Sequence, residues 1–284
     1  MTQRMDKRED EDLRKIITEQ PSRYQDLEKM SVRELVGAIN REDGLVHKAV
    51  RKALPQIERL INEILPRMEQ GGRVFYIGSG TSGRLGVLDA SELPPTFGVP
   101  GNMVIGLISG GDVALRKAVE KAEDDPGQAW EDMKRFDINR HDTIIGIAAS
   151  GTTPYVVGGL QQARREGLLT GCITCNPGSP VTEAAEIAVE AVVGPEFLTG
   201  STRMKAGTAQ KMILNMITTS LMIKLGKVKG NRMINMQLTN NKLVRRGTRM
   251  IMEELNLDAD QARDLLLKHG SVRLAIETWN RENS

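Results

Sequence analysis

Hydrophobic positions in the first 70 residues recur with the spacing of helices. The run Ser31-Val32-Arg33-Glu34 has the spacing of a capping box and predicts a helix that ends at about Asn40. From about Leu45 to Glu69 the apolar residues fall on one stripe of a long helix, which Pro55 is expected to bend or split. Two glycines, Gly71 and Gly72, then end the helical region.

From residue 73 onward, short apolar runs alternate with amphipathic segments. The runs predict strands at 73–77, 103–108, 142–148, 170–175 and 186–193. The segments between them predict helices at about 83–92, 112–123, 126–135, 154–166 and 180–185. The first of these helices is expected to end before Pro94-Pro95. Strands that are apolar on both faces and separated by helices indicate an α/β fold with a helix-covered parallel sheet.

The last third of the chain again has helical periodicity. A long helix is expected at about 204–225, ended by Gly226, and a linker at 228–235. Three helical patterns follow, near 236–254, 258–268 and 271–278, with Asp258 and Ser271 as N-caps and Gly270 as a C-terminal cap. We therefore expect N-terminal helices in residues 1–70 that pack on the α/β domain, which spans 71–230. A small three-helix subdomain is expected at 236–284.

Composition narrows the choice of partners. The 284 residues include 39 basic and 37 acidic side chains, with no long run of one sign, and only 3% aromatic residues. Neither a nucleic acid nor a membrane surface is indicated as a partner. The charged segment Met1–Asp10 does not resemble a secretory signal, and no apolar run approaches the roughly 20 residues that cross a bilayer. We expect a cytoplasmic protein.

The two cysteines, Cys172 and Cys175, have the spacing of a redox or metal motif. They lie in an apolar run that predicts a strand, where this spacing puts them on opposite faces. The three histidines are scattered along the chain. We therefore expect buried, reduced thiols and no metal site.

The segment Gly78-Ser79-Gly80-Thr81-Ser82-Gly83 lies between a predicted strand and a predicted helix. Such a turn directs backbone N–H groups toward an anion at the positive end of the helix dipole. It also fits the G-x-G-x-x-G fingerprint of dinucleotide-binding proteins. A dinucleotide site needs an acidic residue about 20 positions later, and Asp112 fits loosely because a Ser-Gly-Gly turn precedes it.

A second turn rich in hydroxyl groups follows another predicted strand. It contains Ser150, Gly151, Thr152 and Thr153, whereas the first turn carries Ser79, Thr81 and Ser82. Six hydroxyls at one sheet edge suit the three terminal oxygens of a phosphate monoester. Three alternatives remain open from the residues alone: a sugar phosphate, a dinucleotide, or serines and threonines that only cap helices.

Carboxylates and cations provide the remaining candidates for chemistry. Glu92 is expected at the negative end of its helix dipole, which would raise its pKa and suit a general acid. Glu120 and Glu123 are one helical turn apart, with a solvated face or a salt bridge as the alternative. Arg203 and Lys205 lie at a helix start, where cations are unfavourable unless an anion is near or solvent covers them.

These pieces together resemble the N-acetylmuramic acid 6-phosphate etherase family of the sugar-isomerase (SIS) fold. The resemblance runs from about residue 18 to the end of the chain. Its longest matching segments are 78–86, 88–96, 106–111, 118–124, 148–155, 175–179 and 199–211. Leu93 and Thr152 depart from the family pattern and are expected to tune the pocket at most.

The resemblance implies a SIS-type, flavodoxin-like sandwich and a lyase that needs no cofactor. Such an enzyme removes the lactyl ether of N-acetylmuramic acid 6-phosphate by elimination and hydration, in cell-wall amino sugar recycling. By motif position Glu92 matches the acid and Glu123 the second catalytic carboxylate, with Glu120 as a neighbour. The like charges of Asp124 and Asp125 are expected to raise the pKa of Glu123.

The resemblance also implies a set of substrate contacts and a homodimer. Phosphate contacts match Ser82, Ser150 and Thr153 best, and Arg203 and Lys205 are candidates for the lactate carboxylate. Sites are expected near the subunit interface. Two other functions on the same fold compete: a sugar-phosphate sensor without catalysis and an aldose–ketose isomerase. Both glutamates speak against the sensor, and the segments around Glu92 and Arg203 favour the etherase over the isomerase.

Overall fold

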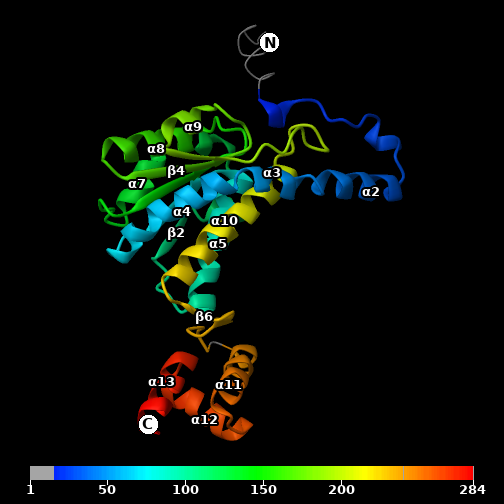
Figure 1. Cartoon of the computed structure of the whole chain (residues 1–284). Helices are drawn as coiled ribbons and strands as arrows, with labels where there is room; N and C mark the ends of the chain where they lie inside the picture. The colour runs from blue at the N-terminus through cyan, green and yellow to red at the C-terminus, as the bar shows by residue number, and fades with distance from the viewer. Residues whose placement is uncertain (1–15, 239, 284) are drawn as a thin grey trace. The chain divides into compact units, whose positions relative to one another are not determined.

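A computed structural model describes residues 16–238 and 240–283, so the charged segment Met1–Asp10 lies outside the described residues (Figure 1). The chain divides into two compact units. Unit 1 contains the described residues up to Asp89 together with Val104–Ile217. Unit 2 contains Ala90–Met103 and the residues from Thr218 onward. No helix in the described part of the chain is long and apolar enough to span a membrane.

Unit 1 is built on a sheet of five parallel strands in the order β2-β1-β3-β4-β5. The strands are β1 Val74–Gly78, β2 Val104–Ile108, β3 Thr143–Ile147, β4 Leu169–Thr174 and β5 Ile187–Glu190. The predicted α/β fold with a parallel sheet is thus confirmed. The strand order reverses between β1 and β3, and ligands of such sheets bind beyond the carboxyl ends of the strands at this point.

Helices cover both faces of the sheet (Figure 1). They are α2 Val32–Asp43, α3 Val46–Lys52, α4 Leu54–Glu69, α5 Gly80–Phe97, α6 Val113–Arg116, α7 Gln128–Lys134, α8 Pro154–Arg165, α9 Pro180–Ala184 and α10 Lys205–Lys224. Short 3-10 helices form at Ile17–Glu19, Leu27–Lys29 and Glu120–Asp124. On one face, α7, α8 and α9 form a buried core with Phe75, Ile77 and Ile144. On the other face, α5 lies close to Tyr76 at Gly86, and Leu60 of α4 contacts Gly171.

Two predictions about the N-terminal helices are confirmed. The capping box is present, because Glu34 N–H donates to Ser31 Oγ at 3.4 Å and Ser31 N–H donates to Glu34 Oε2 at 2.8 Å. The expected break at Pro55 separates α3 from α4, with this proline in the first turn of α4. A proline is tolerated there because that N–H has no helical partner.

The prediction that Pro94-Pro95 ends the helix of the glycine turn was wrong. Helix α5 contains both prolines and ends at Phe97. A proline removes one donor but keeps its carbonyl, and the N–H of Gly98 donates to the carbonyl of Pro94 at 2.9 Å. Gly98 then leaves the helix with φ +65°, a conformation that glycine adopts readily.

The predicted helix at 112–123 was also wrong in its extent. Helix α6 stops at Arg116, and a separate 3-10 helix begins at Glu120. Arg84 of α5 accounts for the stop, because its guanidinium donates to the carbonyls of Ala114 and Leu115 at 2.6 and 3.1 Å. Those carbonyls would otherwise accept from the next helical turn.

The C-terminal part of unit 2 has a core of its own. Its helices are α11 Asn241–Leu255, α12 Ala259–His269 and α13 Val272–Glu282, packed around residues such as Ile251 and Leu266. The predicted caps are confirmed: Asp258 forms a capping box, the Ser271 side chain accepts from Leu274 N–H, and Gly270 has φ +71°. The stretch expected as a linker instead contains a short antiparallel pair, β6 Val228–Lys229 and β7 Arg232–Met233.

Candidate active site

The two hydroxyl-rich turns follow neighbouring strands at the reversal point of the sheet. Gly78 of β1 pairs with Ile147 of β3, so the segments that follow these strands leave the sheet side by side. Helix α5 begins at Gly80, earlier than predicted, so Thr81 and Ser82 lie in its first turn, whereas the second hydroxyl turn directly precedes α8. Both helix N-termini therefore lie at this edge, where their dipoles favour an anion.

Hydroxyl groups of the first turn are linked to neighbouring segments. The Ser109 hydroxyl, at the end of β2, donates to Ser79 Oγ at 2.7 Å. The Ser82 hydroxyl, in a side chain of a residue only 7% exposed, donates to Oε1 of Gln210 at 2.9 Å. Thr81 is half-buried, and a Cβ added at Gly207 of α10 would lie 3.4 Å from its methyl carbon. The start of α10 therefore packs directly against the first turn.

Hydroxyl groups of the second turn do not cap α8. Ser150 Oγ lies 3.0 Å from Thr152 Oγ1 and accepts from the N–H of Thr152 at 3.3 Å. Thr153 occupies the N-cap position of α8, but its side chain makes no capping hydrogen bond. Helix capping therefore does not explain why this turn is rich in hydroxyl groups. Gly151 has φ +78°, and a Cβ there would collide with Oγ of Ser179.

The side chain of Asn176 anchors the segment that leads into the second turn. It is 4% exposed, and its amide nitrogen donates to the carbonyl of Ala149 at 2.8 Å and to Thr18 Oγ1 at 3.0 Å. Its amide oxygen accepts from the N–H of Ile17 at 2.6 Å. One buried side chain thus joins the N-terminal segment to the edge of the sheet.

Glu123 lies beside the first turn. A cleft of about 90 Å³ is lined by residues of that turn, of the β2 loop and of the segment up to Glu123: Gly80, Arg84, Ser109, Ala114, Ala118, Val119 and Glu123. Glu123 is exposed. The backbone of Glu120 belongs to the same 3-10 helix, while its side chain lies outside the described part of the structure. The break after α6 is what lets this segment turn toward Gly80.

Glu92 is placed differently from the expectation. It is exposed and lies within α5, five residues before the helix ends at Phe97, so the argument from a helix end does not apply to it. It belongs to the part of α5 that is in unit 2, whereas the first turns of the helix belong to unit 1. The departure Leu93 beside it is 4% exposed and packs inward.

Lys205 is engaged in a buried ion pair. The lysine is 1% exposed, and its Nζ lies 2.5 Å from Oε2 of Glu42, a residue that is 6% exposed. Glu196 caps the same helix, since its two oxygens accept from the N–H groups of Lys205 and Ala206 at 2.9 Å each. Burial raises the pKa of Glu196 above its ordinary value. Arg203, two residues before Lys205, is exposed.

Five of these residues are not among those predicted from the sequence: Glu42, Ser109, Asn176, Glu196 and Gln210. Ser109 carried a usable signal, because it follows a strand of the same parallel sheet as the two turns. Glu42, Asn176 and Gln210 contact segments 128 to 163 residues away in the sequence, so local patterns do not reveal them. Glu196 accepts from N–H groups only nine and ten residues later.

The two cysteines are not candidates for the chemistry of this site. Cys172 and Cys175 are both unpaired and buried, which confirms the prediction. Burial raises the pKa of each thiol to about 12, so both stay protonated and unreactive near neutral pH. Across the described residues, no group of His, Cys, Asp and Glu has the arrangement of a metal site.

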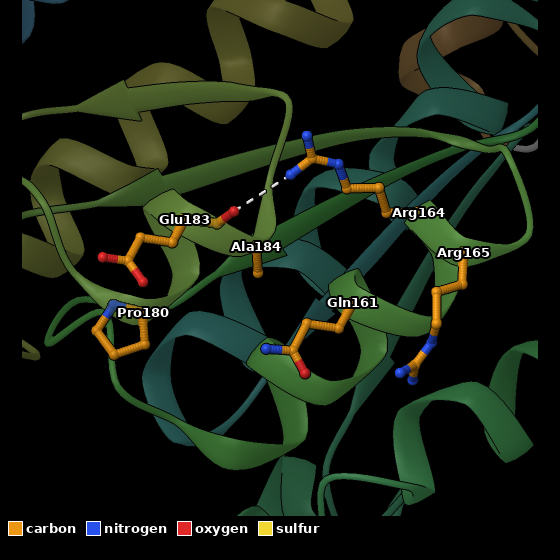
Figure 2. A pocket seen from close by; sticks show the side chains of 6 residues that line it. All are labelled: Gln161, Arg164, Arg165, Pro180, Glu183 and Ala184. Carbon is orange, nitrogen blue, oxygen red and sulfur yellow. Dashed lines mark hydrogen bonds between the residues drawn. The ribbon is translucent and has the colours of Figure 1, made fainter.

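A larger hollow of about 740 Å³ lies between the ends of α8 and α9 (Figure 2). Arg164 reaches across it and donates to the carbonyl of Glu183 at 3.3 Å. Arg164 and Arg165 lie at the C-terminal end of α8, whereas the second hydroxyl turn precedes the N-terminal end of this helix. None of the residues that line this hollow comes from either turn, so it is separate from the candidate site.

Comparison with known proteins identifies the family. The SIS domain model matches residues 125–220, and the model of the glucokinase regulatory protein N-terminal SIS domain matches residues 56–164. N-acetylmuramic acid 6-phosphate etherase of Bacteroides thetaiotaomicron is 63% identical over 268 residues, which cover 94% of this chain and 97% of the relative. The chain belongs to the N-acetylmuramic acid 6-phosphate etherase family.

Two further etherases of the family are equally similar. The protein of Bacteroides fragilis is 64% identical, with 93% of this chain and 94% of the relative covered. The protein of Porphyromonas gingivalis strain ATCC 33277 is 63% identical, with 94% and 97% covered. Membership of the etherase family confirms the resemblance, and it does not favour the sensor or the isomerase.

Solved structures support the fold. A phosphoheptose isomerase from Francisella tularensis superposes with a TM-score of 0.52 at 16% identity, covering 69% of this chain and 100% of that one. A Bacteroides fragilis protein, described as a phosphosugar isomerase involved in capsule formation, gives a TM-score of 0.53 at 20% identity, covering 69% and 92%. The etherase family chain thus shares the SIS fold with these proteins.

Proposed function

We propose that this chain is a carbon–oxygen lyase that cleaves the D-lactyl ether of N-acetylmuramic acid 6-phosphate. The products are N-acetylglucosamine 6-phosphate and D-lactate. The chain is 63–64% identical to etherases over 93–94% of its length, which supports this reaction. The structural observation that carries the proposal is the cleft in which Glu123 lies beside the first hydroxyl turn, with the second turn following the neighbouring strand.

The phosphate of the substrate binds between the two turns. Its ligands are hydroxyl and backbone groups of both turns: Ser79, Thr81, Ser82, Ser150, Gly151, Thr152 and Thr153. A phosphate dianion only accepts hydrogen bonds, so hydroxyl and N–H donors suit it. Two helix N-termini, those of α5 and α8, add favourable electrostatics at the same edge.

The reaction proceeds by elimination followed by hydration, without a cofactor. Opening of the sugar ring exposes an aldehyde, which makes the proton at carbon 2 acidic. Glu123 removes this proton, and Glu92 protonates the ether oxygen as the bond to carbon 3 breaks and lactate leaves. Water then adds to carbon 3 and a proton returns to carbon 2, which yields N-acetylglucosamine 6-phosphate.

Cationic groups have different roles in this proposal. Arg203 is exposed at the start of α10 and is the candidate partner of the lactate carboxylate. Lys205 acts indirectly, because its ammonium is paired with Glu42 and holds the start of α10 in place. Glu120 neighbours Glu123 in the sequence and contributes to the same part of the site.

The proposal also covers the cellular location and the oligomeric state of the enzyme. We place the enzyme in the cytoplasm, in the recycling of cell-wall amino sugars, and expect a homodimer. Helix α2 supports the homodimer because it extends away from the sheet of unit 1 (Figure 1). It exposes Val32 and Val36, which are 76% and 61% exposed. Apolar side chains on an unpartnered helix face suit a second copy of the chain.

The direct test is to incubate the protein with N-acetylmuramic acid 6-phosphate and to measure D-lactate enzymatically. We expect lactate together with N-acetylglucosamine 6-phosphate, and far less lactate from unphosphorylated N-acetylmuramic acid. Phosphosugar binding without lactate would instead support the sensor, and a ketose phosphate product would support the isomerase.

Serine variants test the phosphate contacts. Ser82→Ala and Ser150→Ala should weaken binding of the phosphorylated sugar, because each removes a donor, and leave binding of the unphosphorylated sugar unchanged. Equal weakening for both sugars would show that these serines do not bind the phosphate.

A further inference from the structure

Gln210 of α10 has an unusual environment for a buried amide. The residue is 1% exposed, and its Oε1 accepts the hydroxyl proton of Ser82 at 2.9 Å. Among the described residues, no group pairs with its Nε2, although that atom is also buried. A buried N–H donor without a partner is unfavourable, so this half of the amide needs an explanation.

The position of Gln210 relates it to the first hydroxyl turn. Gly207 lies three residues earlier on the same face of α10, where an added Cβ would lie 3.4 Å from the methyl carbon of Thr81. Gln210 in turn contacts Ser82. This face of α10 therefore supports two consecutive residues of the turn that the proposed function assigns to the phosphate.

The direction of the Ser82–Gln210 hydrogen bond decides what Ser82 offers a ligand. A serine hydroxyl has one proton and two acceptor lone pairs. While that proton is donated to Oε1 of Gln210, Ser82 can only accept, and a phosphate oxygen needs a donor.

We propose that Gln210 is a positioning residue that turns its amide over when phosphate binds and so releases the Ser82 proton for the phosphate. After the amide turns, Nε2 occupies the place of Oε1 and donates to Ser82 Oγ. The two ends of an amide have nearly the same shape, so the turn needs no repacking. Nε2 gains a partner while Oε1 moves to the position without one, so the turn is driven by the bond between the serine proton and the phosphate. This inference rests on the proposed phosphate site but not on the chemistry at carbon 3.

Two substitutions separate this role from simple packing. Gln210→Glu keeps the shape and an acceptor but removes the donor, so Ser82 stays committed to it. Gln210→Met keeps the length and removes both polar ends. Each variant is made in the natural chain and in Ser82→Ala, where Gln210 has no hydroxyl to direct. Gln56→Met, at a glutamine whose buried Oε1 also has no partner among the described residues, is the matched control.

The measurement is the dissociation constant of N-acetylglucosamine 6-phosphate by isothermal titration calorimetry. We expect Gln210→Glu to weaken binding by about tenfold more in the natural chain than in Ser82→Ala, where only its charge acts. Gln210→Met should weaken binding by about threefold in the natural chain and leave Ser82→Ala unchanged. Gln56→Met should leave the constant unchanged. If Gln210→Glu does not fold, the Gln210→Met pair decides alone.

Equal effects in both backgrounds would overturn the proposal, since a packing role does not depend on the Ser82 hydroxyl. Binding without lactate release would contradict the proposed lyase and leave this binding test valid. A natural chain that does not bind the phosphosugar at all would overturn both.

Discussion

Single residues at the carboxyl edge of the sheet differ in how far the sequence reveals them. Ser79 and Ser150 were predictable because each lies within three residues of the end of a strand, and the ends of parallel strands share one edge. Gln210 and Glu42 were not, because their partners Ser82 and Lys205 are 128 and 163 residues away. Each of the two occupies an ordinary position in its helix. Its role follows only from the contacts between the start of α10 and segments distant in the sequence.

The two carboxylates carry the proposed chemistry and can be tested separately. Glu92→Gln and Glu123→Gln should each lower the rate of lactate release by about 10²–10⁴-fold, the usual contribution of a positioned acid or base. The dissociation constant of N-acetylglucosamine 6-phosphate should change little, because neither group binds the phosphate. Glu131→Gln, on the surface of α7, is the control and should keep the natural rate. A natural rate in either site variant would remove that glutamate from the mechanism.

Lys205→Met tests whether Lys205 stabilises the fold or binds the substrate. The substitution leaves Glu42 buried without a counter-ion, so the free energy of unfolding in urea should fall by about 3–5 kcal/mol. Lys134→Met, which breaks an exposed pair with Glu131, should cost no more than about 1 kcal/mol. Unchanged stability together with a raised KM would contradict this account and return Lys205 to the substrate site.

At the scale of elements, the order of strands and helices was predictable and their ends were not. The alternation of apolar runs with amphipathic segments predicted the parallel sheet correctly, because a strand that is buried on both faces is apolar throughout. The passage of α5 through Pro94 is accompanied by one hydrogen bond, and the early stop of α6 at Arg116 by two. The carbonyl of Pro94 accepts from Gly98, and Arg84 occupies the carbonyls that would continue α6.

The second hydroxyl turn depends on Gly151 for its shape. Gly151→Ala adds a Cβ at φ +78° that collides with Ser179. We expect calorimetry to show at least about tenfold weaker binding of N-acetylglucosamine 6-phosphate, because the collision displaces the turn, whereas the positive-φ strain of about 1–3 kcal/mol is shared with the control. Gly178→Ala is the control, because that glycine has φ +64° but open space around a Cβ. Similar binding by both variants would mean that close packing at Gly151 does not shape the site.

At the scale of the whole molecule, the family and fold were recognisable from long motifs, and the boundaries of its parts were not. The three regions expected from the sequence, 1–70, 71–230 and 236–284, remain a prediction. The structure groups Ala90–Met103 with the residues from Thr218 onward, so the end of α5 and the C-terminal helices share a unit. A linear pattern does not reveal such a grouping because it joins segments more than 100 residues apart.

The homodimer is testable through α2. Light scattering after size-exclusion chromatography should give twice the chain mass of 31.3 kDa for the natural protein. Val32→Glu combined with Val36→Glu should give a monomer, because charges would be buried in the proposed interface. Leu274→Glu, at an exposed apolar position of α13, should remain a dimer. A natural protein that is monomeric, or a double variant that stays dimeric, would contradict a dimer through α2.

Cleavage of the bond between carbon 3 and the ether oxygen is the central claim, and the fate of solvent oxygen tests it most directly. The protein is incubated with N-acetylmuramic acid 6-phosphate in ¹⁸O-labelled water, and both products are examined by mass spectrometry. The account predicts unlabelled D-lactate, because the ether oxygen leaves with lactate, and one label at carbon 3 of N-acetylglucosamine 6-phosphate. Label in the hydroxyl group of lactate would show attack of water on the lactyl carbon and would contradict the lyase mechanism.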